Sequence, residues 1–429
     1  MKLFERLFKH ITLAFLLCFF APSTASSPNN EPTLQADSIE ISLLTCGPRQ
    51  QVYSLYGHTA IRFQDKQTGR DIAINYGVFS FDQPFFVLRF VFGLTDYEMG
   101  IAPFDIFEWE YGPTGCGVRQ QVLNLTAQEK MAIAQAVDRN MEPQNRVYRY
   151  NFFYDNCTTR ARDIIANNLN GRIVYDTSTP QHLNTSTPQH HNTPAQYPTF
   201  RNLIHNYNET HRWARFGNDL LLGVKADYNT TFEQQQFLPE RLCADFERAH
   251  IISADGTKRN LVSSSFWLFE PTTKQQSIQQ TNMSILDVFS PLVTFSILSI
   301  LTLIIAIVEY RRKRIIWVFD TSIMLTTGAC GLLLFAMIFS QHPTVSLNLQ
   351  ILLLNPINIF MLYSVTKAAR QNRIHWWTKA WSALILLLLA GSFLQSYAEG
   401  ITIVALSLLL RNISNIYTFK NTGSKQPEA

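Results

Sequence analysis

The residues best suited to chemistry lie between Tyr148 and Asp163, in the segment YRYNFFYDNCTTRARD. The pattern predicts an aromatic strand that runs into Asp155, Asn156 and Cys157 and is followed by a helix, since Asp and Asn are common N-caps. A cysteine in the first turn of a helix lies beside unpaired backbone N–H groups and the positive end of the helix dipole, and both stabilise the thiolate. Cys157 is therefore a candidate nucleophile, although a buried, inert cysteine fits the same position.

A thiol nucleophile needs an imidazole base, and His58 is the strongest candidate. It follows Gly57 at the start of the strand-like segment HTAIRFQD, whereas His205 and His211 lie in a polar stretch. Asn75, in the next strand-like segment, is expected to accept a hydrogen bond from Nδ1–H and to leave Nε2 free to take the thiol proton. The alternative for Asn75 is an ordinary turn residue.

The N-terminus predicts export from the cytoplasm. Residues 1–25 form a secretory signal, with three basic residues before the run ITLAFLLCFFA and small residues at the cleavage site, and residues 26–36 are expected to be a linker. The formal net charge of +4 over 429 residues is too small to indicate nucleic-acid binding. The polar repeat at 177–194 predicts a mobile loop. Its histidines are not expected to bind a metal, because the segment has no cysteine or carboxylate.

The second half of the chain predicts a membrane domain at 284–417, followed by a cytoplasmic tail at 418–429. Four segments are long and apolar enough to cross a bilayer, namely 289–310, 315–339, 347–365 and 381–397. A fifth, 400–410, is short for a span unless it continues past Arg411. Basic residues gather at 311–314 and 367–373, so the positive-inside rule places these loops in the cytoplasm and the preceding domain outside the inner membrane.

The exported domain, expected at 37–245, has a mixed pattern. Strand-like segments lie at 38–46, 58–65, 71–77, 117–125 and 146–152. A helix is expected at 126–140, where Thr126 and Glu129 have the spacing of a capping box. Because strands and helices interleave irregularly, the pattern favours an α+β fold over a doubly wound sheet. Residues 246–283 are expected to connect this domain to the membrane domain.

Substrate-binding residues are expected in three places. The stretch 78–93 contains Phe85 and Phe86 among its six phenylalanines, which fit either a wall for acyl chains or a core helix. Arg160 is a cation on the helix that begins with Cys157. His342 lies in a polar group near the outer face of the predicted spans, where such residues serve a function or form hydrogen bonds between helices.

Five cysteines remain after the signal is removed, in a compartment that favours disulfides. Cys330 lies inside a predicted span and Cys157 is the candidate nucleophile. Of the remaining three, Cys46 and Cys116 are the pair we expect to be bridged.

Several blocks, in order along the chain, resemble the Lnb N-terminal periplasmic domain family. They are YGHTAIRF, DIAINYGVFSFDQPFF, FGLTDYEMGI, QQVLNLTAQEK, YNFFYDNCTTRARD, GNDLLLGVKAD and FLPE. The resemblance runs from about residue 42 to 245, and the hydrophobic segment that follows resembles the membrane region of longer Bacteroidetes members. The order of histidine and cysteine also resembles permuted papain-like enzymes typified by lecithin:retinol acyltransferase.

The resemblance implies a fold, an activity and roles. The fold is an α+β, permuted papain-like periplasmic domain followed by an all-α transmembrane bundle. His58 matches the base and Cys157 the nucleophile, while Asn75 takes the third polar place, where the permuted relative uses a histidine. The implied activity is lipoprotein N-acyltransferase, which moves a fatty acyl chain from a membrane phospholipid through a Cys157 thioester to the N-terminal amine of diacylated lipoproteins, with no cofactor and no metal.

The residues support this chemistry without the resemblance. A Cys–His pair transfers acyl groups through a thioester, and phospholipid esters are the acyl donors available outside the inner membrane, where ATP and acyl-CoA are not reliably supplied. Two other classes remain open. A membrane-tethered cysteine hydrolase or amidase acting on peptide or cell wall would have an open, polar cleft. A non-enzymatic assembly factor would bury Cys157 away from His58.

Overall fold

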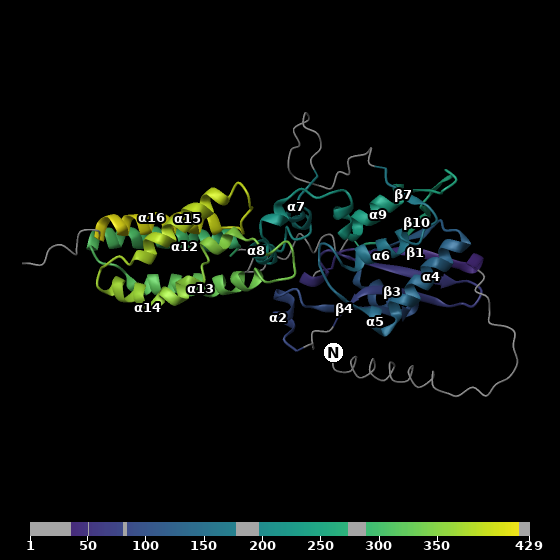
Figure 1. Ribbon diagram of the computed structural model, residues 1–429, viewed down its shortest axis with the longest axis horizontal. Helices are drawn as coiled ribbons and strands as arrows, with labels where there is room; N and C mark the ends of the chain where they lie inside the picture. Colours follow the sequence, from purple (N-terminus) through teal and green to yellow (C-terminus); the bar gives the residue numbers. More distant parts are fainter. Residues whose placement is uncertain (1–35, 50, 80–83, 177–196, 273–288, 420–429) are drawn as a thin grey trace, which may run out of the picture.

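The computed structural model describes residues 36–49, 51–79, 84–176, 197–272 and 289–419. These residues form an elongated molecule, with a sheet domain at one end and a helical domain at the other (Figure 1). The predicted signal segment, nearly all of the linker, the repeat at 177–194 and most of the predicted tail lie outside the described residues.

The sheet domain is built on seven strands in the order β10-β5-β1-β2-β3-β4-β6, with neighbouring strands antiparallel. Their bounds are β1 Ile39–Cys46, β2 His58–Asp65, β3 Asp71–Val78, β4 Asp96–Pro103, β5 Val118–Leu123, β6 Val147–Arg149 and β10 Val262–Phe269. Three helices cover one face, α4 (Ala127–Met141), α6 (Cys157–Ala166) and α9 (Pro239–Arg248), and α3 (Phe104–Tyr111) covers the other. The α+β prediction is confirmed.

Alternating residues of β1 explain why both faces of the sheet are covered. Ile41 and Leu43 pack with the cluster under α4, α6 and α9, whereas Leu44 and Cys46 pack with the cluster under α3. Successive strand side chains point to opposite faces, so an apolar run such as LL must be covered on both sides. The helix α4 begins at the predicted capping box, in which Thr126 accepts from Glu129 N–H and Glu129 accepts from Thr126 N–H.

The remaining elements of this domain are short. The helices are α2 Phe86–Val91, α5 Pro143–Arg146, α7 Phe200–His205 and α8 Arg212–Leu221. The 3-10 helices are η1 Ala36–Ser38, η2 Val52–Ser54, η3 Gly112–Thr114, η4 Val224–Asp227 and η5 Glu233–Phe237. A second sheet has the order β7-β8-β9, formed by Arg172–Val174, His250–Ile252 and Lys258–Asn260.

The segment expected to be a connector, 246–283, contributes three strands instead. β8 and β9 complete the small sheet, and β10 is the edge strand of the large sheet, paired with β5. The serines at positions 263–265 interrupt the apolar pattern of β10, so the sequence did not predict this strand. Polar residues suit an edge strand, and here Ser265 Oγ accepts from Arg119 Nε at 2.8 Å. The sheet domain therefore continues to Phe269.

The helical domain contains α12 Pro291–Arg312, α13 Trp317–Met337, η6 Leu349–Leu352, α14 Ile357–Arg370, α15 Trp376–Gly391 and α16 Ile401–Phe419. Among the described residues, four helices are long and apolar enough to cross a membrane, namely α12, α13, the helical segment Leu349–Arg370 and α16. The expected span at 381–397 corresponds to the shorter α15. The fifth segment, expected to be short, is one of the four.

A buried charge cluster explains why α16 continues past Arg411. The Arg411 guanidinium donates to Glu309 at 2.7 and 2.9 Å and to Asp320 at 2.7 and 3.0 Å, and Asn415 donates to Glu309 at 2.9 Å. A charge in an apolar environment is costly unless it is paired and hydrogen-bonded. Here α12 and α13 supply the partners, so the arginine does not interrupt the helix.

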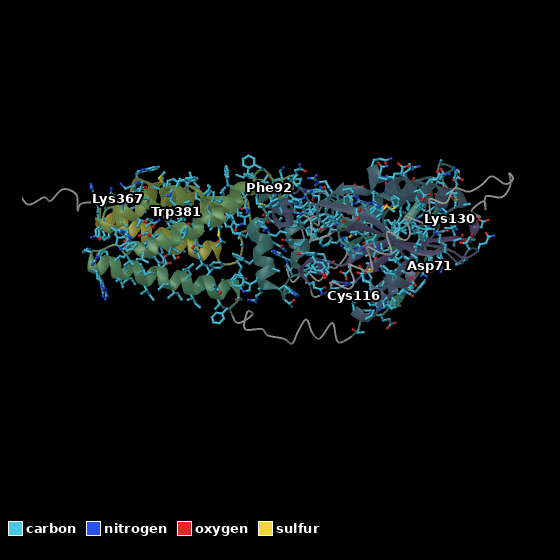
Figure 2. All side chains as sticks on the ribbon, turned by 90° about the horizontal axis from the view of Figure 1, so that it is seen from below. Asp71, Phe92, Cys116, Lys130, Lys367 and Trp381 are labelled. Atoms are coloured by element: carbon cyan, nitrogen blue, oxygen red, sulfur yellow. The ribbon has the colours of Figure 1, made fainter. Side chains whose placement is uncertain are left out.

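The two domains are joined by a polar contact region. Gly223 N–H donates to Thr344 O at 2.8 Å, and a Cβ on Gly223 would lie 2.0 Å from Leu347 O, so only glycine fits. Asn348 Nδ2 donates to Leu220 O at 2.8 Å. Figure 2 shows Phe92 at this junction, where its carbonyl accepts from Gln341 N–H at 3.0 Å, and Lys367 towards the opposite end of the helical domain.

Candidate active site

A cleft of about 340 Å³ lies at the end of the sheet where β2 begins and β3 ends. His58, Asn75 and Cys157 all line it. The sequence separates these residues widely, but antiparallel pairing places β2 beside β3, and α6 packs over this sheet with its N-terminus at the cleft. The structure therefore brings the three predicted catalytic residues together.

Cys157 is the first residue of α6, and Asn156 caps the helix. Asn156 Oδ1 accepts from the backbone N–H groups of Thr158 and Thr159, both at 2.9 Å. Its Nδ2 donates to the carbonyls of Phe152 and Phe237, also at 2.9 Å. The cap therefore fixes the helix start from two directions and holds the thiol at the positive end of the helix dipole.

His58 is the first residue of β2 and pairs with Cys46 of β1. The preceding Gly57 has a φ of 77°, and a Cβ there would lie 2.5 Å from Cys46 O, so glycine is needed for the chain to enter the strand. The His58 ring stacks near Tyr111 of α3, with ring centroids 6.3 Å apart. Strand pairing and stacking together fix the position of the imidazole.

The two nitrogens of His58 have roles opposite to those expected. Nε2, not Nδ1, lies 3.0 Å from Asn75 Oδ1. An amide oxygen can only accept, so Nε2 carries the proton and the neutral ring presents a bare Nδ1 to Cys157. Asn75 faces His58 because β2 and β3 are antiparallel, with Asn75 paired to Ala60 two residues along from the histidine. Asn75 is therefore more than a turn residue.

Electrostatics favour a thiolate–imidazolium pair. Burial by itself raises the pKa of Cys157, but the charge and hydrogen bond of His58, the Thr59 N–H and the Thr158 hydroxyl outweigh it and lower the pKa to about 7. Burial likewise lowers the pKa of His58, but the adjacent Cys157 and the Asn75 hydrogen bond raise it above its ordinary value. Each group stabilises the charged form of the other.

The cleft has aromatic walls, and one of them includes Phe79 from the phenylalanine-rich stretch 78–93. The Tyr97 ring lies 4.8 Å from Phe79 and 4.1 Å from Tyr150, and these rings make one wall. Tyr56 and Phe152, 4.8 Å apart, contribute another. These residues come from separate strands and loops, so only the folded register brings them together.

Two family models match the chain. The model described as Lnb N-terminal periplasmic domain matches residues 27–202, and that described as Lnb transmembrane domain matches residues 280–422. Together they cover more than half of the sequence, one on each side of the domain junction. The chain belongs to the Lnb family. Searches of curated proteins and of solved structures found no match.

This Lnb protein is accordingly a multi-pass membrane protein with a periplasmic domain, and the cleft belongs to that domain. Arg160 does not line the cleft. Its guanidinium donates to Asp155 at 2.6 and 2.8 Å and lies 3.5 Å over the Tyr148 ring. With Nε and Nη2 bonded to Asp155, Arg160 secures the strand-to-helix turn, and its expected contact with substrate stays a prediction.

Phe85 and His342 also lie outside the cleft lining. Phe85 is 77% exposed and precedes α2, whereas Phe86 begins α2 and its side chain is not among those described. His342 lies beside α2, with its ring 6.2 Å from that of Phe90. Phe85 and His342 therefore lie at the domain junction (Figure 1) rather than at Cys157.

The predicted bridge between Cys46 and Cys116 is absent, and both thiols are free and buried. Burial raises the pKa of Cys46 well above its ordinary value, and the nearby Cys116 adds to this effect. Both pack in the cluster under α3. They serve as small apolar core residues.

Proposed function

We propose that this Lnb protein is an inner-membrane acyltransferase that moves a fatty acyl chain from a phospholipid, through a thioester on Cys157, to the N-terminal amine of diacylated lipoproteins. The observation that carries the proposal is the Cys157–His58 pair, which lines one cleft with aromatic walls and in which each group stabilises the charged form of the other. A sheet domain from about residue 37 to Phe269 would hold the site, with the basic loops of the membrane domain in the cytoplasm.

The first half-reaction loads the enzyme. His58 Nδ1 takes the thiol proton, and the Cys157 thiolate attacks the carbonyl carbon of a phospholipid ester. Negative charge develops on the carbonyl oxygen near the N-terminus of α6, where the helix dipole stabilises it. The ester C–O bond then breaks, and the imidazolium gives its proton to the departing lysophospholipid oxygen. Cys157 is left as a thioester.

The second half-reaction forms an amide. An α-amino group has a pKa of about 7.7–8, so a useful fraction is neutral at the pH where the Cys157 thiolate is stable. Its nitrogen attacks the thioester carbonyl, and His58 Nδ1 takes the proton that the nitrogen loses. The thiolate leaves and the lipoprotein gains a third acyl chain.

The cleft lining supports transfer over hydrolysis. The rings of Tyr56, Phe79, Tyr97, Tyr150 and Phe152 line much of the cleft, beside the charged Arg49 and Glu110, and offer acyl chains an apolar contact that a peptide or cell-wall substrate does not need. Such walls exclude water, which competes with the amine for the thioester. A lipid-anchored amine reaches the site from the bilayer side.

The test is reconstitution of the full-length protein with phospholipid and a synthetic diacylated lipopeptide. We expect mass spectrometry to show the peptide heavier by one fatty acyl group, attached as an amide at its N-terminus. The same peptide with its amine acetylated should remain unchanged and serves as the control. Release of free fatty acid without amide formation would favour the hydrolase and contradict the proposal.

Asn75→Ala is expected to lower kcat about 10-fold with little change in KM, since it removes one hydrogen bond that orients His58. Asn75 is a positioning residue, because it acts on the base and not on the reacting atoms. Asn75→Asp, which keeps an acceptor at this place, should restore most of the turnover and raise the pKa of His58 in the pH–rate profile. An alanine variant with the wild-type kcat would contradict this role.

A further inference from the structure

The cleft also carries one cation and one anion that the acyl-transfer steps do not use. Arg49 and Glu110 both line it. Arg49 Nη2 lies 3.7 Å from Glu110 Oε1, which is too long for a hydrogen bond. The Glu110 side chain is 55% exposed, so its carboxylate faces the opening, whereas that of Arg49 is only 20% exposed.

Arg49 is held close to the catalytic pair. Its guanidinium carbon lies 4.0 Å from the centre of the Tyr111 ring, and the same ring stacks near the imidazole of His58. Its backbone N–H donates to Ser54 O at 2.9 Å, which fixes the chain at its base. A cation stacked on an aromatic ring is attracted by the ring and keeps its N–H groups in a fixed fork.

The donors of this guanidinium are not satisfied by oxygen. Among the described residues, Nη2 is buried without a hydrogen-bond partner, and no side-chain nitrogen of Arg49 bonds to an oxygen. The Cys116 thiol is hydrogen-bonded to the Arg49 side chain, and Glu110 lies farther away. Arg162, Arg201, Arg259 and Arg411 show the contrast, since each donates to oxygens within 3.4 Å. An arginine with unused donors beside a reaction centre suits an anionic ligand.

We propose that Arg49 and Glu110 form a headgroup subsite that binds the phosphate and the ammonium group of a zwitterionic phospholipid acyl donor. This inference rests on the proposed function. The guanidinium fork matches two phosphate oxygens, and Glu110 at the opening pairs with the ammonium beyond the phosphodiester. A headgroup that ends in glycerol has no ammonium group to pair with Glu110. The Glu110 carboxylate would then lie near a phosphate that is also negative, and this repulsion disfavours binding.

The subsite predicts a donor preference that can be measured. The full-length protein is assayed in mixed micelles of a neutral detergent, with the diacylated lipopeptide as acceptor. The donors are phosphatidylethanolamine and phosphatidylglycerol with identical acyl chains. We expect the wild type to favour phosphatidylethanolamine by about 10-fold in kcat/KM, as one charge-assisted contact predicts.

Glu110→Gln should bring the two donors to nearly equal use, and Glu110→Lys should favour phosphatidylglycerol. Arg49→Gln should raise the apparent KM of both donors by about 10- to 100-fold while leaving the KM of the lipopeptide unchanged. Glu40→Gln is the matched control, because Glu40 is another partly exposed carboxylate, paired with Lys66 at 2.7 Å and absent from the cleft lining. It should keep the wild-type preference.

The outcomes separate the inference from the proposed function. Equal use of both donors by the wild type, or an unchanged preference in both Glu110 variants, would overturn the headgroup subsite. A change in the KM of the lipopeptide instead would assign Glu110 to the acceptor and also overturn it. No transfer by the wild type from either donor would contradict the proposed function itself. Because Glu110 is largely exposed, its variants should unfold at the wild-type temperature even if Arg49→Gln is destabilised.

Discussion

Cys157→Ser is expected to abolish acyl transfer, lowering the rate by roughly 10⁴-fold or more, while the protein stays folded. The serine hydroxyl occupies a similar volume, and the Asn156 cap that fixes the start of α6 does not involve the thiol. A hydroxyl, however, has a far higher pKa than a thiol whose pKa is lowered to about 7. The imidazole of His58 therefore cannot generate a comparable nucleophile from it.

Intact-protein mass spectrometry checks this result directly. Wild-type protein given phospholipid without acceptor should gain one fatty acyl mass, located on the peptide that contains Cys157, and should lose it when the lipopeptide is added. Cys157→Ser should carry no such adduct. Cys330→Ser is the matched control, since Cys330 is also a half-buried free thiol but lies in α13. Conversion at the wild-type rate by Cys157→Ser would show that another group is the nucleophile.

His58→Ala should lower transfer by about 10²- to 10⁴-fold, because it removes the base and the proton carrier of both half-reactions. It should also change the charge state of the nucleophile. In the wild type the Cys157 thiolate forms as the pH rises through about 7. Without the imidazole, burial is the dominant influence and raises the pKa, so less thiolate is present at neutral pH.

The rate of alkylation by iodoacetamide, followed against pH on the Cys157 peptide, measures this shift. The midpoint should lie near 7 in the wild type and move upward in His58→Ala. His211→Ala is the control, because this histidine bonds to Thr210 and does not line the cleft. The double variant of Cys157 and His58 should be scarcely slower than either single variant, since nucleophile and base act as a unit. An unshifted midpoint would mean that His58 does not act on the thiol.

The sequence alone determined the local elements and the identity of the central pair. Alternation in β1, β2 and β3, the Thr126 capping box and the Asn156 cap are short-range patterns, so each could be recognised without knowledge of distant residues. The proximity of His58 and Cys157 could also be expected, because thiol chemistry requires a base. Their catalytic roles stay predictions, which the variants above test.

The tertiary structure decided everything that depends on packing between distant segments. Because β3 places Asn75 beside Nε2 of His58, Nδ1 is the nitrogen that faces the thiol. The sequence had predicted the reverse assignment of the two nitrogens. Arg160 seemed free in the sequence but is held by Asp155 and Tyr148.

The same reason accounts for the elements that the sequence misjudged. β10 is a strand because β5 offers it an edge, and α16 continues through Arg411 because α12 and α13 supply carboxylates. Arg49 lies in the cleft because its guanidinium contacts the Tyr111 ring of α3. No local sequence pattern predicts that contact. A hydrogen bond, an ion pair or a ring stack joins two residues that can be far apart in the sequence. The partner of either residue is therefore known only from the folded structure.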